Sequence, residues 1–483
     1  MAIRRYVADA DNTITNAFKE SLLTRGTGSN MGESDISQIF YLYAAANSSS
    51  HEQARVLTKF PMAEIAADRT AGKIPASGSV NFYIKLTNAP HGDTLPTKFT
   101  LTVAPISRSW DEGYGLDMEE YSNYGVSNWI SASTSASSDD GGWVAEGGDY
   151  LTSSNYSQYF PLGTEDLDVD ITGLAEEWIS GTMDNYGVGV HLTASEETGT
   201  RSFYSKMFFA RGSQYFFKRP VIEARWDSAV TDDRNDFVLS SSLLPASDNL
   251  NKLYLYNKFR GRYVNIPDVG TGSIYMSLYS GTTAPVGARL PLQGGAYVVT
   301  GGYVSTGIYS ASVAMGTNLD QVFDVWHDDS SSTPVEFYTG SAITVRDYTA
   351  SDTSDPTTYI MKITNLKAEY STQESARLKV YARNKDWQPT IYTIASSQIE
   401  NTTINNLYYR LTRVADDYEV ISYGTGTLAD PIEYTKLSYD GNGNYFDFDM
   451  SMLQPDYEYA FQFMVSEYGE YREQPEVFKF RVV

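Results

Sequence analysis

The stretch DLDVDITGLAEEWISGTMDNYGVGVHL, residues 166–192, contains the patterns that decide the fold. Its first letters, DLDVD, and its last, GVGVHL, alternate polar or small with apolar residues, which is typical of strands with one buried face. Between them, Leu174 and Trp178 are four residues apart and therefore share one face of a short helix. We expect that helix to have Thr172 as its N-cap and to end at Gly181.

Further motifs precede and follow this stretch in a fixed order. Their order and wording resemble the DNRLRE domain, a β-sandwich related to carbohydrate-binding modules and found in surface and structural proteins. The resemblance covers roughly residues 20–227 and implies an extracellular or virion-surface binding and structural module rather than an enzyme. The motifs are RVLTKFPMAEI at 55–65, SVNFYIKLTNAP at 79–90, SWDEG at 109–113, SNW at 127–129, GGW at 141–143, GGDY at 147–150 and KRPVIEARW at 218–226.

The composition indicates an all-β chain of several domains. Its 483 residues are enough for about three domains of ~100–200 residues each, and its 38 Tyr and 37 Gly suit half-buried strands and turns. The net charge of −24 argues against a nucleic-acid partner and leaves many carboxylates for optional Ca²⁺ binding. Because the chain has no cysteine, disulfides, thiolate metal sites and cysteine nucleophiles are excluded.

The start of the chain, MAIRRYVADAD, has no apolar run after its two arginines. No stretch approaches the ~18 apolar residues of a membrane span. We therefore expect no signal peptide and no membrane insertion. Two explanations stay open for a surface-type β protein without an export signal: an upstream segment has been cut away, or the protein leaves the cell by lysis as part of a phage particle.

Polar stretches divide the chain into expected segments. Residues 1–20 are interpreted as an extended N-terminal arm, and residues 21–227 as the DNRLRE-like jelly-roll β-sandwich. Residues 228–247 are polar, contain a proline and are interpreted as a linker. Short alternating runs at regular spacing then predict two Ig-like β-sandwiches, at residues 248–350 and 358–483, with a second polar linker, SDTSDPT, between them.

Three segments spread over the whole chain also resemble virion structural proteins of large tailed phages, in particular the T4-like myophages of marine bacteria. This resemblance implies a component of the neck or collar, the tail or the capsid surface, assembled in the bacterial cytoplasm. Its partners would be other virion proteins and copies of itself, with host cell-surface glycans as a further candidate. The segments are RRYVADADNTITNAFKE, GGAYVVTGGYVSTGIYSASVA and SYDGNGNYFDFDMSMLQPDYEYAFQF.

Two pairs of residues are candidates for binding. Trp129 and Trp143 lie in Gly- and Ser-rich stretches and are candidate platforms on which a sugar stacks, whereas Trp110 of WDEG belongs to the structural pattern of the family. Arg4 and Arg5 form a positive spot before the Thr-rich stretch TITNAF. An extended arm of this kind can add a strand to a neighbour's open sheet edge, so we expect it to attach the chain to the particle; a frayed terminus is the alternative.

Motifs for catalysis and for metal binding are weak or missing. The sequence has no GxSxG and no phosphate-binding loop, and His191 lies in an alternating strand. DGNGN at 440–444 begins like a Ca²⁺ loop, but Tyr445 and Ser451 replace the required Gly and Glu, so we interpret it as a hairpin turn. We therefore expect no enzyme and no obligatory cofactor. The alternatives are a glycan-binding module of a bacterial surface protein and, less favoured, a glycan hydrolase.

Overall fold

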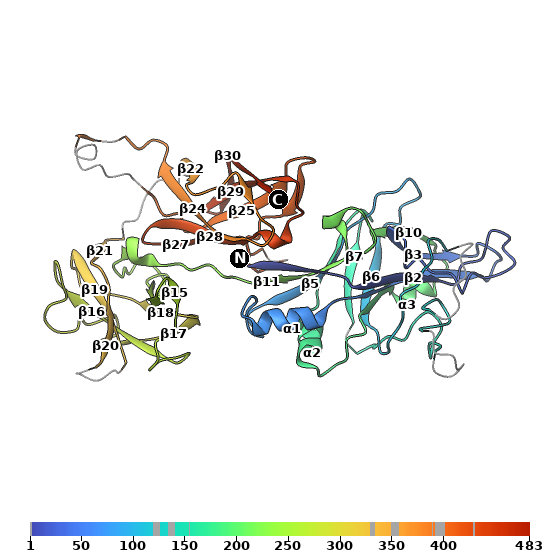
Figure 1. Cartoon of the computed structure of the whole chain (residues 1–483), viewed down its shortest axis with the longest axis horizontal. Coiled ribbons are helices and arrows are strands. Elements are labelled where there is room, and N and C mark those ends of the chain that lie inside the picture. Colours follow the sequence, from blue (N-terminus) through green and yellow to red (C-terminus); the bar gives the residue numbers. More distant parts are fainter. Residues whose placement is uncertain are drawn as a thin grey trace. The chain divides into compact units, whose positions relative to one another are not determined.

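The structure is a computed structural model that describes residues 2–118, 126–133, 141–153, 155–328, 334–348, 357–388, 390–391, 401–427 and 430–483. Its regular structure is almost entirely β-strand, so the all-β prediction is confirmed (Figure 1). The chain divides into two compact units. The first comprises Met1–Asp227 and Gly426–Tyr434, and the second comprises Ser228–Thr425 and Thr435–Val483.

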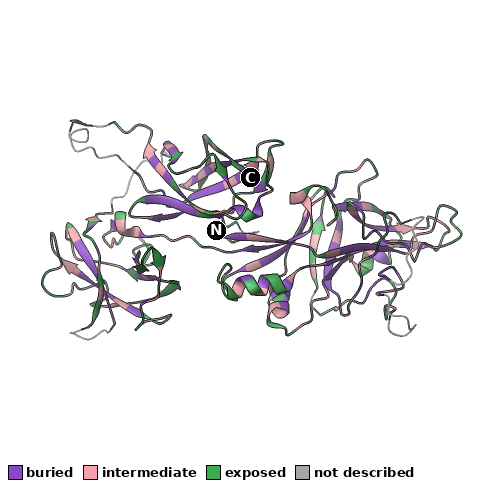
Figure 2. Cartoon of the chain, viewed as in Figure 1, coloured by how far each residue is buried: buried purple, intermediate pink, exposed green. Residues whose placement is uncertain are grey.

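The first unit contains a β-sandwich of two sheets. Period-two alternation places apolar side chains on the inner faces, and these strand faces are buried (Figure 2). The four-stranded sheet has the order β1 (Ile3–Val7), β11 (Val221–Arg225), β5 (Asn81–Leu86) and β8 (Leu167–Asp170). The seven-stranded sheet has the order β10 (Phe203–Phe209), β3 (Ile36–Tyr43), β4 (His51–Lys59), β9 (Val188–Leu192), β6 (Phe99–Pro105) and β7 (Tyr156–Phe160), with β2 (Ala10–Thr15) paired to β4.

Two edges of this sandwich are bridged to the other sheet. The side chain of Gln158 in β7 donates to the Asp166 carbonyl at 2.7 Å and accepts from the Asp168 amide at 2.8 Å, which joins β7 to β8. Residues 87–89, which continue β5, form backbone hydrogen bonds with residues 207–209 of β10. These bridges use edge groups that would otherwise be open to pairing with another chain.

The expected helix is present as α2, Thr172–Ser180, and it ends at Gly181, whose φ is +75°. Leu174 and Trp178 are both buried, as their spacing predicts. Thr172 is not the N-cap: it lies inside the helix, and the Asp170 carboxylate accepts from its amide at 2.8 Å and its hydroxyl at 2.5 Å. The other helices of this unit are α1 (Met62–Thr70), α3 (Ala194–Glu197) and the 3₁₀ turn η1 (Phe216–Lys218).

Residues 1–20 do not form a free arm. β1 pairs along its whole length with β11, and β2 pairs with β4 over six residues. The side chains of Ile3, Tyr6 and Ile14 are buried. The expectation of an arm available to a neighbouring subunit is therefore wrong, because these strands already use their hydrogen-bonding groups and apolar side chains inside the sandwich.

The second unit begins with a sheet that folds around a core of its own. The first half of β17, Val299–Gly301, pairs with β16, and its second half, from Gly302 onward, pairs with β18. The change of partner therefore falls between Gly301 and Gly302. Trp326, Tyr309 and Phe237 are fully buried in this core. The order is β12 (Phe237–Val238), β21 (Ile343–Arg346), β19 (Gln321–His327), β16 (Ile274–Ser280), β17 (Val299–Ser305), β18 (Ile308–Val313) and β13 (Asn251–Tyr256), with β20 (Glu336–Thr339) on β19; β14 (Lys258–Phe259) and β15 (Arg262–Tyr263) pair separately.

The C-terminal sandwich follows in the same unit. Tyr459, Phe461 and Phe463 alternate along β29 and are fully buried, as their period predicts. Phe461 meets Phe446 of the facing sheet edge-on, with ring centroids 5.1 Å apart. One sheet has the order β22 (Tyr359–Ile363), β24 (Ser375–Asn384), β28 (Gly443–Asp449) and β27 (Ser438–Asp440); the other has β23 (Glu369–Tyr370), β30 (Glu470–Val482), β29 (Glu458–Glu467), β25 (Leu407–Arg413) and β26 (Tyr418–Ile421), and η3 (Met450–Met452) is a 3₁₀ turn.

The segment expected as the first linker, residues 228–247, carries ordered structure. It contains the 3₁₀ turn η2 (Asp233–Asn235) and β12, which pairs in parallel with β21. Arg234 holds the buried Asp324 carboxylate through two bonds of 2.7 Å. This segment is therefore built into the second unit. The second expected linker lies outside the described residues except for Thr357.

Candidate binding site

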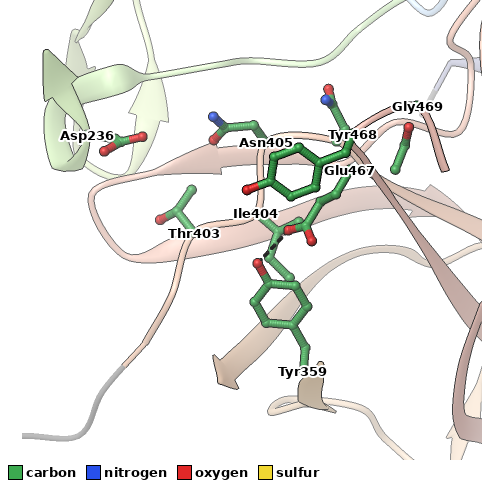
Figure 3. A pocket seen from close by; sticks show the side chains of 10 residues that line it. Asp236, Tyr359, Thr403, Ile404, Asn405, Glu467, Tyr468 and Gly469 are labelled. Carbon is green, nitrogen blue, oxygen red and sulfur yellow. Dashed lines mark hydrogen bonds between the residues drawn. The ribbon is translucent and has the colours of Figure 1, made fainter. Parts of the chain in front are cut away.

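A polar pocket of ≈ 320 Å³ opens on the C-terminal sandwich (Figure 3). One side is formed by the end of β29 and the turn after it, and another by the irregular segment 403–406 that leads into β25. Tyr359 at the start of β22 and Asp236 complete the lining. The pocket thus presents amide, hydroxyl and carboxylate groups together with two tyrosine rings.

Hydrogen bonds fix the carboxylate of Glu467 in this pocket. Its Oε1 accepts from the Tyr359 hydroxyl at 2.6 Å (Figure 3). Its Oε2 accepts from the Thr357 amide at 3.1 Å. Burial, followed by this hydrogen bond, raises the pKa of Tyr359 above its ordinary value. The phenol therefore stays protonated and keeps donating, and Glu467 keeps accepting capacity for a ligand hydroxyl.

Tyr468 lies at the mouth of the pocket in an unusual backbone conformation. It forms the two-residue turn between β29 and β30 with Gly469, and the two φ angles are +52° and +79°. A hairpin turn of this type favours Asn-Gly, because a side chain at positive φ costs about 1 kcal/mol or more. Tyr468 is nevertheless 68% exposed. An exposed aromatic side chain at a strained backbone position beside a pocket makes Tyr468 a candidate binding residue.

A larger cleft of ≈ 940 Å³ adjoins this pocket in the same unit and shares Asp236 and Thr403 with it. Its lining is polar as well, with Asn401, Ser341 and Thr344 among its residues. Both hollows are therefore lined largely by polar groups. No group of three or more His, Asp or Glu side chains able to hold a metal ion occurs among the described residues.

The predicted sugar platforms lie elsewhere and are buried. Trp129 is 4% exposed and Trp143 is 8% exposed, and both pack with Trp110 in one apolar cluster of the first unit. The Trp143 indole donates to the Asn128 carbonyl at 2.8 Å, and the Arg55 guanidinium covers Trp129 at 5.3 Å. Neither ring can stack on a glycan in this structure, because the long connection between β6 and β7 folds them inward. This prediction is wrong.

Arg4 and Arg5 are also used inside the first unit. Arg4 pairs with Asp68 of α1 at 2.6 Å, and Arg5 pairs with the buried Glu223 of β11 at 2.7 Å. Both side chains are less than a fifth exposed. The known partners of the two arginines lie in α1 and β11, whereas Trp129 and Trp143 belong to an apolar cluster with Trp110.

The remaining candidates have structural roles. The sequence DGNGN forms the tight hairpin between β27 and β28, with Asp440 paired to Gly443, so the turn interpretation is confirmed. His191 packs against Tyr150, with ring centroids 5.0 Å apart, and burial lowers its pKa. A second histidine, His327, is fully buried, and its Nε2 lies 2.9 Å from the Ser277 hydroxyl.

Tyr468 and Glu467 are not among the residues predicted above as candidates for binding. The signal was present in SEYGEY at 466–471, where a single Gly interrupts two alternating runs. An X-Gly pair in that position predicts a two-residue hairpin turn, and a tyrosine as X is a poor turn residue.

Comparisons with known proteins leave the family open. No family model matches the chain, and no curated protein matches it. A solved structure, the native conformation of the alpha-2-macroglobulin of E. coli, aligns with 100% of this chain and 26% of its own, at 8% identity and a TM-score of 0.16. The chain thus spans about a quarter of that protein's length, and a similarity at this level carries no argument. Among the described residues, no helix has the length and apolar character needed to cross a membrane.

Proposed function

We propose that this chain is a structural component of a tailed-phage virion, placed at the neck or collar, the tail or the capsid surface. Two features support the proposal. Sequence segments spread over the whole chain resemble virion structural proteins. The architecture is a series of β-sandwiches. Its work there is contact with other virion proteins and with copies of itself. The DNRLRE-like character of the first sandwich is part of this proposal.

The proposal includes adhesion to host cell-surface glycans through the pocket beside Tyr468. The observation that carries it is Tyr468, whose side chain is exposed and whose backbone is strained. Glu467, Asn405 and Asn406 line the same pocket. A tyrosine face packs against the C–H face of a sugar, while amides and a carboxylate bind its hydroxyls. The same pocket would serve a glycan-binding module of a bacterial surface protein, which is the alternative function.

Affinity electrophoresis of the whole protein in gels that contain host surface polysaccharide tests the adhesive part. Tyr468→Asn should weaken retention by about tenfold, because it removes the ring but suits the positive φ. The matched control is Tyr114→Asn, at a tyrosine of the first unit that is 60% exposed. Equal retention of both variants, or no retention of the wild type, contradicts the proposal. Release of reducing ends during the assay would favour the hydrolase alternative instead.

A further inference from the structure

Residues 249–319 form one of the stretches with a net positive charge in this acidic chain. Residues 249–319 hold five Lys or Arg and one Asp, so this stretch carries +4 and the rest of the chain −28. Four of these cations lie between residues 249 and 267, where there is no acidic residue at all. On a strongly acidic protein, such a stretch attracts anionic groups.

Three of the cations sit on the hairpin formed by β14 and β15. Lys258 pairs with Tyr263 and Phe259 with Arg262, so each pair shares one face of the hairpin. Arg260 occupies the turn, and its guanidinium lies 5.1 Å from the Phe259 ring centre. Phe259 is 63% exposed. One face therefore carries Phe259 and Arg262, and the Arg260 guanidinium lies against the exposed Phe259 ring.

The base of the hairpin holds it in a fixed direction. The Asn257 amide donates to the Gly307 carbonyl at 2.7 Å, and its side chain donates to the Val264 carbonyl at 2.6 Å. The Asn265 side chain accepts from the Gly307 amide at 2.7 Å. A Cβ on Gly307 would lie 2.6 Å from the Val264 nitrogen, so the strands approach as closely as glycine permits. A hairpin held in this way loses little conformational freedom on binding.

The turn itself is not optimised for stability. Arg260 and Gly261 have φ angles of +50° and +80°, which require a turn that favours Asn-Gly. An arginine at the first position costs free energy relative to asparagine. None of Lys258, Arg260 and Arg262 forms an ion pair within the part of the chain that the structure describes. Their charges are therefore available to another molecule.

We propose that the hairpin Lys258–Tyr263 docks onto a carboxylate-rich surface of a second copy of this chain. Guanidinium groups bind carboxylates through two parallel hydrogen bonds, and arginine and aromatic side chains dominate the centres of protein interfaces. The −28 carried by the rest of the chain supplies the complementary partner. The inference rests on the proposed function, because a virion brings many copies of the chain together.

Sedimentation velocity of the full-length protein at about 50 mM and about 500 mM salt tests the docking. The test variant is R260N/R262Q, in which asparagine suits the positive φ of the turn. The control, K362Q/K385Q, removes the same charge at two exposed lysines of the C-terminal sandwich. We expect the wild type and the control to self-associate at low salt, and the test variant to do so at least about tenfold more weakly.

Equal self-association of the two variants would overturn the inference, as would a wild type that stays monomeric at about 100 µM in low salt. A third contrary result is that R260N/R262Q loses dextran sulfate binding while no form of the protein self-associates. The last would assign the hairpin to an acidic polysaccharide. Retention by host polysaccharide through Tyr468 is measured separately and does not depend on the hairpin. Failure of the docking proposal is thus distinguishable from failure of the proposed function.

Discussion

At the scale of single residues, burial decides the role of the tryptophans. Trp129 and Trp143 lie among glycine and serine in the sequence, yet they form a cluster with Ile14 and Leu57 beneath the connection between β6 and β7. Arg55 covers Trp129 and is itself held by Glu197 at 2.5 Å. These rings therefore stabilise the first unit, and their burial keeps them from contacting a ligand at the surface.

Trp129→Ala should lower the free energy of unfolding of the first unit by ~3–5 kcal/mol, because it leaves a cavity under the connection. Polysaccharide retention should be unchanged, since Tyr468 belongs to the second unit. Thermal unfolding followed by circular dichroism provides the measurement. Val144→Ala in the same connection, where the side chain is 90% exposed, is the control. Identical melting temperatures for the two variants would place Trp129 on the surface.

Asp11 makes the first unit sensitive to pH. Its side chain is 1% exposed, and among the described residues its Oδ1 has no hydrogen-bond partner, while its Oδ2 accepts from the Arg211 amide at 2.6 Å. Burial raises the pKa of Asp11 from 3.8 to about 7. The folded state therefore keeps a proton that the unfolded state releases, so this stabilising contribution is present below about pH 4 and is lost as the pH rises through about 7.

Asp11→Asn should remove that loss, because the amide stays neutral and still accepts from the Arg211 amide. We expect the variant to match the wild type near pH 4 and to exceed its stability above pH 7 by up to about 4 kcal/mol. Melting temperatures of both proteins across this range give the difference directly. A difference that does not change with pH would show that Asp11 is ionised in the folded protein.

At the scale of elements, the alternation of apolar and polar residues predicts strands well where the apolar residues are large. The buried faces of β29 and the helix face of Leu174 and Trp178 follow from spacing alone. β1 and β2 do not, because Thr13 and Thr15 are buried polar residues and composition alone does not distinguish them from a solvated arm. For Tyr468, whose binding role is a proposal, SEYGEY predicts the turn, but the exposure of the ring beside a pocket depends on how the sandwich packs.

Removing residues 2–15 should therefore prevent the first unit from folding, rather than leave it intact. The deletion takes β1 from the end of one sheet and β2 from the side of β4, and exposes the apolar partners of Ile3, Tyr6 and Ile14. Limited proteolysis of the full-length and truncated chains is the measurement. Rapid degradation of the region before Ser228 in the truncated chain is expected; equal resistance in both would restore the idea of an arm.

At the scale of the whole molecule, the first unit is not one continuous stretch of sequence. Gly426–Tyr434 belongs to it, and Asp430 of this segment pairs with the buried Arg225 at 2.9 Å. The boundary near residue 227 agrees with the polar composition that follows, but nothing local indicates that nine residues two hundred positions later join the same unit. Long-range assignments of this kind depend on tertiary contacts, which a single sequence does not display.

The central claim is that the chain is a virion component, and mass spectrometry of particles purified by density gradient after host lysis tests it most directly. We expect peptides from both units to co-purify with the capsid and tail proteins, at a constant ratio through the gradient and after a salt wash. Peptides found only in the cell-envelope fraction of the bacterium, and absent from the particles, would contradict it and support a bacterial surface protein instead.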